Sequence, residues 1–270
     1  MAKSFIRSFV HSLIFLMAVV AMCACEKTPE EPSVGGDSSI NVMIDGVHYA
    51  LSGTNAMVIP LPNEEQYQGE VMLPDTLFYN DTAFIVNEIH QNAFRGSELL
   101  TAVRIPKHVR RLPDIAFGMC SRLKTVLFAS NPSLNSIGNL AFCQTSSLST
   151  IELPAKVTSI GNDAFYYSGL VSIVLPEQLP LVQCGVFSHC ERLETVTIGR
   201  SVLMIMENAF DNCKSLRILY CYRSTPPKAS DNAFYKCPIN NCYLYVPASA
   251  VDAYKRVNPW MKFHAIRPIN

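Results

Sequence analysis

The stretch that decides the fold covers residues 157–165 and reads Val157-Thr158-Ser159-Ile160-Gly161-Asn162-Asp163-Ala164-Phe165. Its closing Ala-Phe pair recurs along the chain, and Val186-Phe187 fills the one position where the alanine is missing. The phenylalanines of these pairs are Phe94, Phe117, Phe142, Phe165, Phe187, Phe210 and Phe234. Successive members are 22 to 25 residues apart. A period of this length is the sequence signature of a repeat architecture.

A second apolar pattern, L-x-x-L-x-L, begins five or six residues after each phenylalanine, as in Leu193/Val196/Ile198. In the seventh repeat we assign this pattern to Ile239/Cys242/Leu244. The last two apolar residues of each segment are two positions apart, so their side chains point to one side of a short strand. One unit cannot bury its own apolar edge, but stacked units cover one another. The sequence therefore predicts a β-rich solenoid whose short parallel strands line a concave face, with the phenylalanines in the core.

The repeated motif I-x-x-x-A-F-x-x-C-x-x-L-x-x-I-x-L-P resembles the BspA-like subclass of leucine-rich repeats. Residues 137–142 and 157–165 are close matches, and the resemblance covers roughly residues 65–247. Leu244-Tyr245-Val246-Pro247, followed by Trp260, resembles the C-terminal cap of this family. The resemblance implies a leucine-rich-repeat horseshoe. It also implies a surface or secreted lipoprotein of host-associated anaerobic bacteria that binds host matrix proteins or other cells.

The segments on either side of the repeats (residues 89–247) read as caps. Residues 40–88 contain short apolar runs around an Asp45-Gly46 turn, which is a hairpin signal, and we expect an N-terminal β cap there. Such a cap would shield the open end of the solenoid. Residues 248–270 are expected to form a short C-terminal cap. Local irregularities are expected beside Pro132 and at residues 179–185, where the usual turn is replaced.

Residues 1–24 have the features of a signal peptide. Lys3 and Arg7 precede an apolar run that stops at Cys23-Ala24-Cys25. The small Ala24 just before Cys25 resembles a bacterial lipobox, so Cys25 is the expected lipidation site. Cleavage after Ala24 without lipidation is the alternative. The polar residues 25–39, rich in Pro, Gly and Ser, read as a flexible tether.

These features predict an outer-membrane lipoprotein held to the membrane by its N-terminal lipid. We expect it to be exposed at the cell surface, with a periplasm-facing orientation as the alternative. The chain carries 22 basic and 22 acidic residues, so its formal net charge is zero. Nucleic-acid binding requires a basic footprint, which this composition does not provide, so we expect no nucleic-acid partner. We expect the protein to act as a monomer.

Cysteines and histidines are the residues of this chain that could carry metal binding or nucleophilic chemistry. Cys120, Cys190, Cys213 and Cys237 sit three residues after a repeat phenylalanine. They read as a buried ladder of thiols bonded to backbone, while a disulfide among the last three stays open, since neighbouring coils bring Cα atoms within bridging range. No C-x-x-C pair is present, so no metal or cofactor is expected. Only His189 neighbours a cysteine, and no third group completes a nucleophilic site, so we expect no catalytic residues and no enzyme.

The outward-facing position of each predicted strand forms one column across the sheet. This column, with Arg217 beside it, is the candidate binding site for a protein or glycan ligand: Arg104, Leu127, Glu152, Val174, Thr197, Tyr220 and Tyr243. Exposed tyrosines and aliphatic side chains on a sheet suit an interface core, although strand propensity alone also favours these residue types. The predicted function is a non-catalytic adhesion module of the cell envelope. The alternative is a structural or accessory subunit of an envelope assembly with no external ligand.

Overall fold

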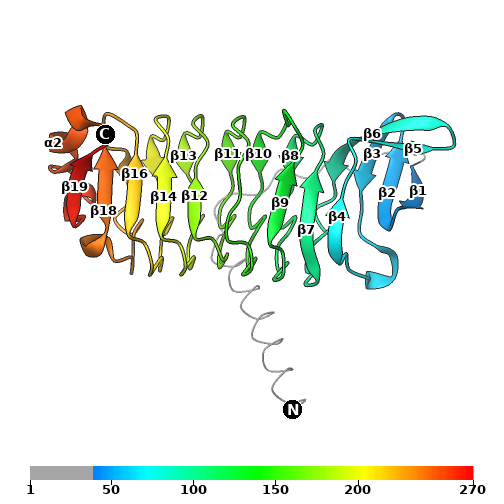
Figure 1. Cartoon of the computed structure of the whole chain (residues 1–270), viewed down its shortest axis with the longest axis horizontal. Helices are drawn as coiled ribbons and strands as arrows, with labels where there is room; N and C mark the ends of the chain where they lie inside the picture. Colours follow the sequence, from blue (N-terminus) through cyan, green and yellow to red (C-terminus); the bar gives the residue numbers. More distant parts are fainter. Residues whose placement is uncertain (1–38, 270) are drawn as a thin grey trace, which may run out of the picture. The chain divides into compact units, whose positions relative to one another are not determined.

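A computed structural model of the chain describes residues 39–269, and Ser39–Asn270 form one compact unit. The expected signal peptide (1–24), the lipidation site Cys25 and the tether up to residue 38 lie outside the described residues. In the compact unit the coils lie side by side in a row (Figure 1). Each coil has about two dozen residues, which is the spacing of the phenylalanines in the sequence. Among the described helices, none is long and apolar enough to span a membrane. The predicted β-solenoid is confirmed.

One side of the coils is formed by the L-x-x-L-x-L segments, and we call it the strand face. Two parallel sheets make up this face, with the strand orders β4-β7-β9 and β12-β14-β16-β18-β19. Their strands are β4 (Gly69–Met72), β7 (Leu100–Ile105), β9 (Thr125–Phe128), β12 (Ser172–Val174), β14 (Thr195–Ile198), β16 (Ile218–Cys221), β18 (Tyr243–Val246) and β19 (Ala265–Pro268). Strands β14 and β16 alternate buried and more exposed side chains, as the two-residue apolar spacing predicts.

The strand face is interrupted at the third repeat. Residues 148–153, which carry the expected strand Leu148/Ile151/Leu153, are not in a strand. This repeat follows the longest interval between phenylalanines, from Phe117 to Phe142, which contains Pro132. Glu152 is exposed, but it lies in this irregular segment between β9 and β12. Its predicted place in a strand is therefore wrong.

A second set of short parallel strands runs along the coils after the strand face. It consists of β8 (Arg111–Leu112), β10 (Ser136–Ile137) and β11 (Ser159–Ile160), and separately β13 (Leu181–Val182), β15 (Met204–Ile205) and β17 (Lys228–Ala229). Thr158 donates its backbone N–H to the carbonyl oxygen of Asn135 in the preceding coil, at 2.9 Å. The residue of the next coil that is equivalent to Thr158 is Pro180, which has no N–H to donate. The sheet breaks there, within the stretch where an irregularity was expected.

The Ala-Phe segments form the third side of the coils and are bonded to one another by their backbones. Phe117 N–H donates to the carbonyl oxygen of Ala141 at 2.8 Å, and Phe142 N–H donates to that of Ala164 at 2.7 Å. Two residues after each phenylalanine the backbone is left-handed, including Tyr167 (φ 54°) and His189 (φ 59°). This conformation costs an ordinary residue ~1–2 kcal/mol. It recurs because it aims the N–H groups at the next coil.

The phenylalanines stack into one column through the core, as predicted. All except Phe234 (6%) are 0% exposed, and neighbouring rings have centroids 5.1–5.6 Å apart. Tyr67 closes the column at its N-terminal end, 4.7 Å from the Phe94 centroid. Trp260 and Phe263 close the C-terminal end against Phe234. Stacked aromatic pairs add ~0.5–1.5 kcal/mol each beyond the area that they bury, so the column ties successive coils together.

The cysteines of the repeat position form the expected ladder. The thiols of Cys120 and Cys190 each donate to the carbonyl oxygen of the phenylalanine one coil earlier, Phe94 and Phe165, both at 3.0 Å. Cys213 does the same to Phe187 at 3.2 Å. Among residues 39–269, none of the eight cysteines is joined in a disulfide. Each of these carbonyl oxygens also accepts a backbone N–H from its own coil, so the thiol is a second donor that links neighbouring coils.

The two ends of the solenoid differ in structure. At the N-terminal end, β1 (Ile40–Ile44) and β2 (Val47–Ser52) form the hairpin expected at the Asp45-Gly46 turn. They join β3 (Asn55–Val58), β5 (Thr76–Tyr79) and β6 (Thr82–Ile89) in one sheet, in the order β1-β2-β3-β6-β5. The short helix η1 (Pro62–Glu64) follows β3 in the chain. Strand β4, within the region predicted as a cap, pairs with β7 and so extends the strand face.

The C-terminal end is closed by short helices and one strand. These elements are η2 (Ile239–Asn241), η3 (Ala248–Ala250), α2 (Val251–Tyr254), η4 (Trp260–Lys262) and β19. Trp260 is fully buried and donates its indole N–H to the carbonyl oxygen of Pro227 at 2.9 Å. Tyr254 is also fully buried, and its hydroxyl donates to the carbonyl oxygen of Arg223 at 3.0 Å. The cap thus covers the last coil with apolar rings whose polar atoms are satisfied.

Candidate functional site

The strand face brings the predicted column together only in part. In β12, β14 and β16 the residues Val174, Thr197 and Tyr220 are in register, one beneath the other. In β18, however, Tyr245 pairs with Tyr220, whereas Tyr243 pairs with Ile218. Tyr243 is therefore not a member of the column, and the prediction is wrong at this position.

The register differs because the seventh repeat is longer at this point. Its turn contains η2 (Ile239–Asn241), so the buried pair of β18 is Leu244 and Val246 rather than the predicted Cys242 and Leu244. The interval from Leu219 to its partner Leu244 is 25 residues, compared with 23 from Val196 to Leu219. A two-residue shift keeps the same face outward, so both tyrosines still point away from the core.

Tyr220 and Tyr245 form an aromatic platform on the strand face. Their ring centroids are 5.0 Å apart and the rings are inclined by 22°. Tyr243 lies in the next column, with the guanidinium of Arg267 over its ring at 4.3 Å and His264 edge-on at 5.1 Å. These contacts hold the tyrosine rings in fixed positions before any ligand arrives.

The platform continues into exposed apolar side chains. Val174 is 64% exposed and Tyr222, just after β16, is 37% exposed. Arg217 is exposed immediately before β16. Leu127 is 48% exposed but lies in the other sheet of the face, beyond the irregular third repeat. The continuous part of the candidate site is therefore the one that spans β12 to β18.

The guanidinium of Arg104 is bonded to residues at the N-terminal end of the solenoid. Its Nη1 donates to the carbonyl oxygen of Leu73 at 2.6 Å, and its Nη2 donates to Asp75 Oδ2 at 3.1 Å. Lys107 N–H donates to the same carboxylate at 2.8 Å. The hydrogen bond from Arg104 lowers the pKa of Asp75 below its usual value, against a smaller opposing effect of burial. Arg104 thus joins the cap to the first repeat, a role that the column pattern gave no means of predicting.

The neighbours His189 and Cys190 face different partners. The Cys190 thiol is fully buried against the Phe165 carbonyl and the Ser168 hydroxyl. The His189 ring stacks on Tyr167 with centroids 4.4 Å apart, and its Nδ1 lies 2.8 Å from Asn212 Nδ2. Burial raises the pKa of the Cys190 thiol to about 12, which disfavours the thiolate that a nucleophile needs. Over residues 39–269, no group of three or more His, Cys, Asp or Glu side chains could hold a metal ion.

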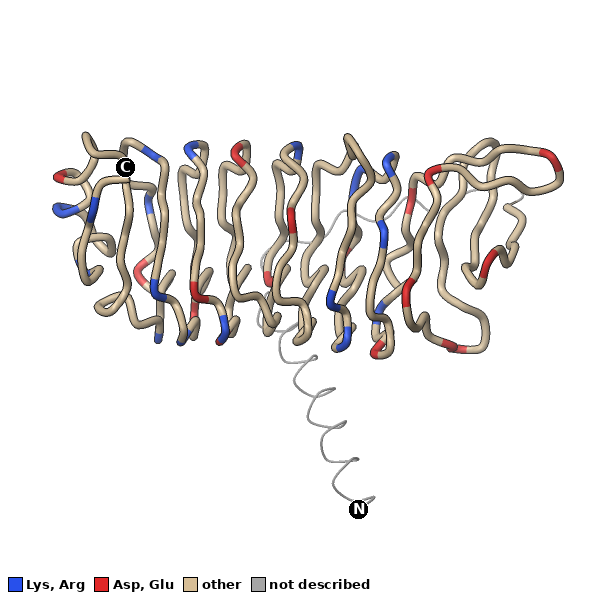
Figure 2. Tube along the Cα trace, viewed as in Figure 1, with Lys and Arg blue, Asp and Glu red and all other residues tan. Residues whose placement is uncertain are grey.

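Charged residues are interspersed along the coils, with both signs present on the turns (Figure 2). The part of the strand face from β12 to β18 presents mainly uncharged side chains, with Arg217 and Glu194 at the strand entrances. The site can therefore offer aromatic stacking, apolar contact and hydroxyl hydrogen bonds on a rigid sheet. These are the contacts found at the centre of protein and sugar interfaces.

The stacked parallel strands, the phenylalanine column and the thiol ladder define the chain as a leucine-rich-repeat solenoid. The profile of the "BspA type Leucine rich repeat region" matches residues 87–217 and 183–254, with six copies. This match covers more than half of the chain. The protein belongs to the BspA-type leucine-rich repeat family.

Solved structures with the same fold include a T. pallidum leucine-rich repeat protein. It is 21% identical, with a TM-score of 0.62 over 86% of this chain and 96% of that one. A leucine-rich repeat protein from Bacteroides ovatus is 18% identical, with a TM-score of 0.50 over 84% of this chain and 76% of that one. At these identities the likeness shows the fold alone. Among curated proteins, none matches the sequence.

Proposed function

We propose that the protein is a non-catalytic binding module of the cell envelope that recognises a protein or glycan through its strand face. The observation that carries this proposal is the stacked pair Tyr220 and Tyr245, whose rings lie 5.0 Å apart beside the exposed Tyr222. Tyrosine combines a large apolar ring with a hydroxyl, and it is enriched where proteins bind their partners. Two tyrosines from neighbouring strands, with a third just after β16, give such a surface a centre.

The architecture favours binding because it is formed in advance. The platform rests on β16 and β18, which pair in parallel and whose inward side chains Leu219 and Leu244 are fully buried. Ordering of side chains and loops opposes association by ~0.5–1.5 kcal/mol for each immobilised side chain. Rings that already stack on one another avoid much of this cost.

Anchoring at the membrane is part of the same proposal. Lipidation at Cys25 would hold the chain at the outer membrane, and the tether of residues 25–39 would leave the strand face accessible. Lipid anchors act through buried methylene groups at roughly 0.8 kcal/mol each, so several acyl chains give stable attachment. We propose a surface-exposed monomer, and protease accessibility on intact cells would separate this from a periplasm-facing one.

The test uses the purified full chain with labelled matrix proteins and a panel of labelled glycans. We expect saturable binding to at least one probe. Hydroxyl-radical footprinting of that complex should protect Tyr220, Tyr222 and Tyr245, whereas the exposed Tyr235 on the Ala-Phe side should react as in the free protein. Absence of saturable binding would overturn the proposal, as would protection confined to Tyr235. Co-purification with a single stoichiometric envelope protein would favour a structural subunit instead.

A further inference from the structure

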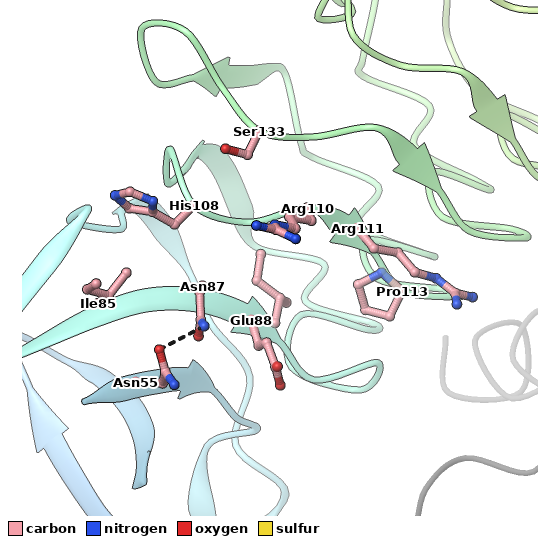
Figure 3. A pocket seen from close by; sticks show the side chains of 10 residues that line it. Asn55, Ile85, Asn87, Glu88, His108, Arg110, Arg111, Pro113 and Ser133 are labelled. Atoms are coloured by element: carbon pink, nitrogen blue, oxygen red, sulfur yellow. Dashed lines mark hydrogen bonds between the residues drawn. The ribbon is translucent and has the colours of Figure 1, made fainter. Parts of the chain in front are cut away.

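A polar hollow lies where the N-terminal cap meets the first repeat, on the side of the second sheet. Its volume is about 600 Å³, within the range of roughly 300–1,000 Å³ usual for small-ligand sites. Asn55 comes from β3, Asn87 and Glu88 from β6, His108 and Arg110 from the loop before β8. Figure 3 shows the two asparagines on neighbouring strands, with His108 and Arg110 above them in the view. The hollow is thus built from segments that are distant in sequence.

The asparagine pair fixes the hydrogen-bonding pattern of the hollow. Asn87 Nδ2 donates to Asn55 Oδ1 at 2.9 Å. This bond sets the orientation of both amides, so Asn55 Nδ2 remains a donor and Asn87 Oδ1 an acceptor. Glu88 adds a carboxylate acceptor, and Ser133 adds a hydroxyl that can donate and accept. Ile85 and Pro113 add apolar surface to the lining.

Cationic side chains outnumber acidic ones in this lining. Arg110 and Arg111 are both exposed, and Glu88 is the acid among the lining residues. Arg111 is held by Asp114 through an Nη2–Oδ1 contact of 3.3 Å. No ion pair or side-chain hydrogen bond to Arg110 is found within residues 39–269. A planar guanidinium in this situation is suited to bidentate binding of a carboxylate.

We propose that this hollow binds a saccharide that carries a carboxylate, such as a hexuronic acid unit. Arg110 holds the carboxylate, while Asn55, Asn87 and Glu88 bond to the ring hydroxyls, which both donate and accept. The mixture of donors and acceptors decides between ligand classes, because Glu88 accepts from a sugar hydroxyl but repels the successive carboxylates of an acidic peptide. The proposal does not depend on the strand face, which lies on a different sheet.

The test measures binding of methyl β-D-glucuronide and of the neutral methyl β-D-glucoside to the purified full chain by isothermal titration and ligand-observed NMR. We expect the glucuronide to bind at least tenfold more tightly than the glucoside. Arg110→Gln should weaken the glucuronide at least tenfold. Arg122→Gln, which removes the same charge from an exposed turn of the second repeat, should leave binding within twofold. Asn55→Ala is a second variant that tests the hydroxyl contacts.

Three results would overturn the proposal. The first is no binding of the glucuronide, or equal binding of the two glycosides. The second is an Arg110→Gln variant that keeps its circular dichroism spectrum and binds like Arg122→Gln. The third is equal competition by acetate or tighter binding of hexaglutamate, either of which would show that a carboxylate without a sugar is sufficient. Tyr220→Ala with Tyr245→Ala should leave glucuronide binding unchanged, so this result is separable from that of the strand face.

Discussion

Among single residues, the contact between Arg104 and Asp75 shows how a side chain expected in a binding site serves the fold. The pair joins β7 to the segment between β4 and β5. The Nη1 atom of Arg104 lies 3.0 Å from Asp75 Oδ1. Both side chains are partly exposed, at 29% and 38%. Solvent therefore screens the pair, and its contribution is modest, at most about 1 kcal/mol.

The first prediction concerns the pH dependence of this contact. The hydrogen bond from Arg104 gives Asp75 a lower pKa in the folded state than in the unfolded state. The stabilisation is thus present above the unfolded pKa, near ~3.9, and is lost as pH falls through the folded value. Asp75→Asn should lower the free energy of unfolding at pH 7 by about 1 kcal/mol or less, and should reduce its dependence on pH below ~4. Urea unfolding at pH 7 and pH 3 measures both.

The control for this variant is Asp81→Asn, at the exposed turn between β5 and β6. It removes the same charge from a carboxylate that forms no salt bridge within residues 39–269. It should unfold like the wild type at both pH values. If the two variants were equally stable at pH 7, Asp75 would make no specific contribution to the cap.

The second prediction concerns the buried thiols. Burial raises the pKa of Cys120 and of Cys190 to about 12, and only the thiolate reacts with alkylating reagents. In the native protein at pH 8, iodoacetamide should leave both residues unmodified, whereas in guanidinium chloride without reductant both should be alkylated. Peptide mass spectrometry measures this. Cys190 that stayed unmodified in the denaturant would instead indicate a disulfide.

Single residues were also where sequence reasoning was weakest. Tyr243 falls outside the column because the apolar pair of the seventh repeat lies two residues later than the spacing predicts, and η2 cannot be recognised from spacing alone. The partners of Arg104 come from a cap outside the repeat, so no periodic pattern could indicate them. The hollow at Asn55, Asn87 and Arg110 was missed for the same reason.

At the level of elements, the phenylalanine column has the largest role in stability. Phe165 is fully buried between Phe142 and Phe187, with centroids 5.3 Å and 5.6 Å away. Phe165→Ala removes both ring contacts and leaves a cavity that the stacked coils cannot close. We expect it to cost about 3–5 kcal/mol.

Guanidinium unfolding followed by circular dichroism measures this loss. Phe78→Ala is the matched control, because Phe78 is 72% exposed in β5 and its loss should change stability by at most ~0.5 kcal/mol. A Phe165→Ala variant as stable as the control would mean that the column does not hold the coils together.

The strands of the repeats could be predicted because each apolar pair must face the core, whatever its neighbours are. Their pairing could be predicted less well. The break at Pro180 follows from a missing N–H group, and the irregularity was expected there. The third-repeat segment at 148–153 has the right apolar residues and still forms no strand, which the apolar spacing alone does not predict. The hydrogen-bonded Ala-Phe side was not foreseen, since left-handed Tyr167 and His189 have no sequence signature.

At the level of the whole molecule, the fold followed from the repeat, because a period of about two dozen residues leaves few ways to bury the apolar edges. The proposed attachment to the membrane leads to a further prediction. Metabolic labelling with an alkyne fatty acid should label the wild-type chain and the Cys23→Ala variant. Cys25→Ala should carry no label, because the proposal places the acyl groups at Cys25. Label retained in Cys25→Ala, or lost in Cys23→Ala, would place the lipid elsewhere.

The proposed function depends most on the tyrosine platform of the strand face, and one comparison of dissociation constants tests it most directly. The double variant Tyr220→Ala with Tyr245→Ala is compared with Tyr235→Ala, which removes a tyrosine that is 55% exposed on another side of the coils. For the probe that binds the wild type, the double variant should weaken binding at least ~10-fold, since central aromatic residues dominate interface energies. Tyr235→Ala should stay within twofold. Equal affinities for the two variants, both folded, would contradict binding through the strand face.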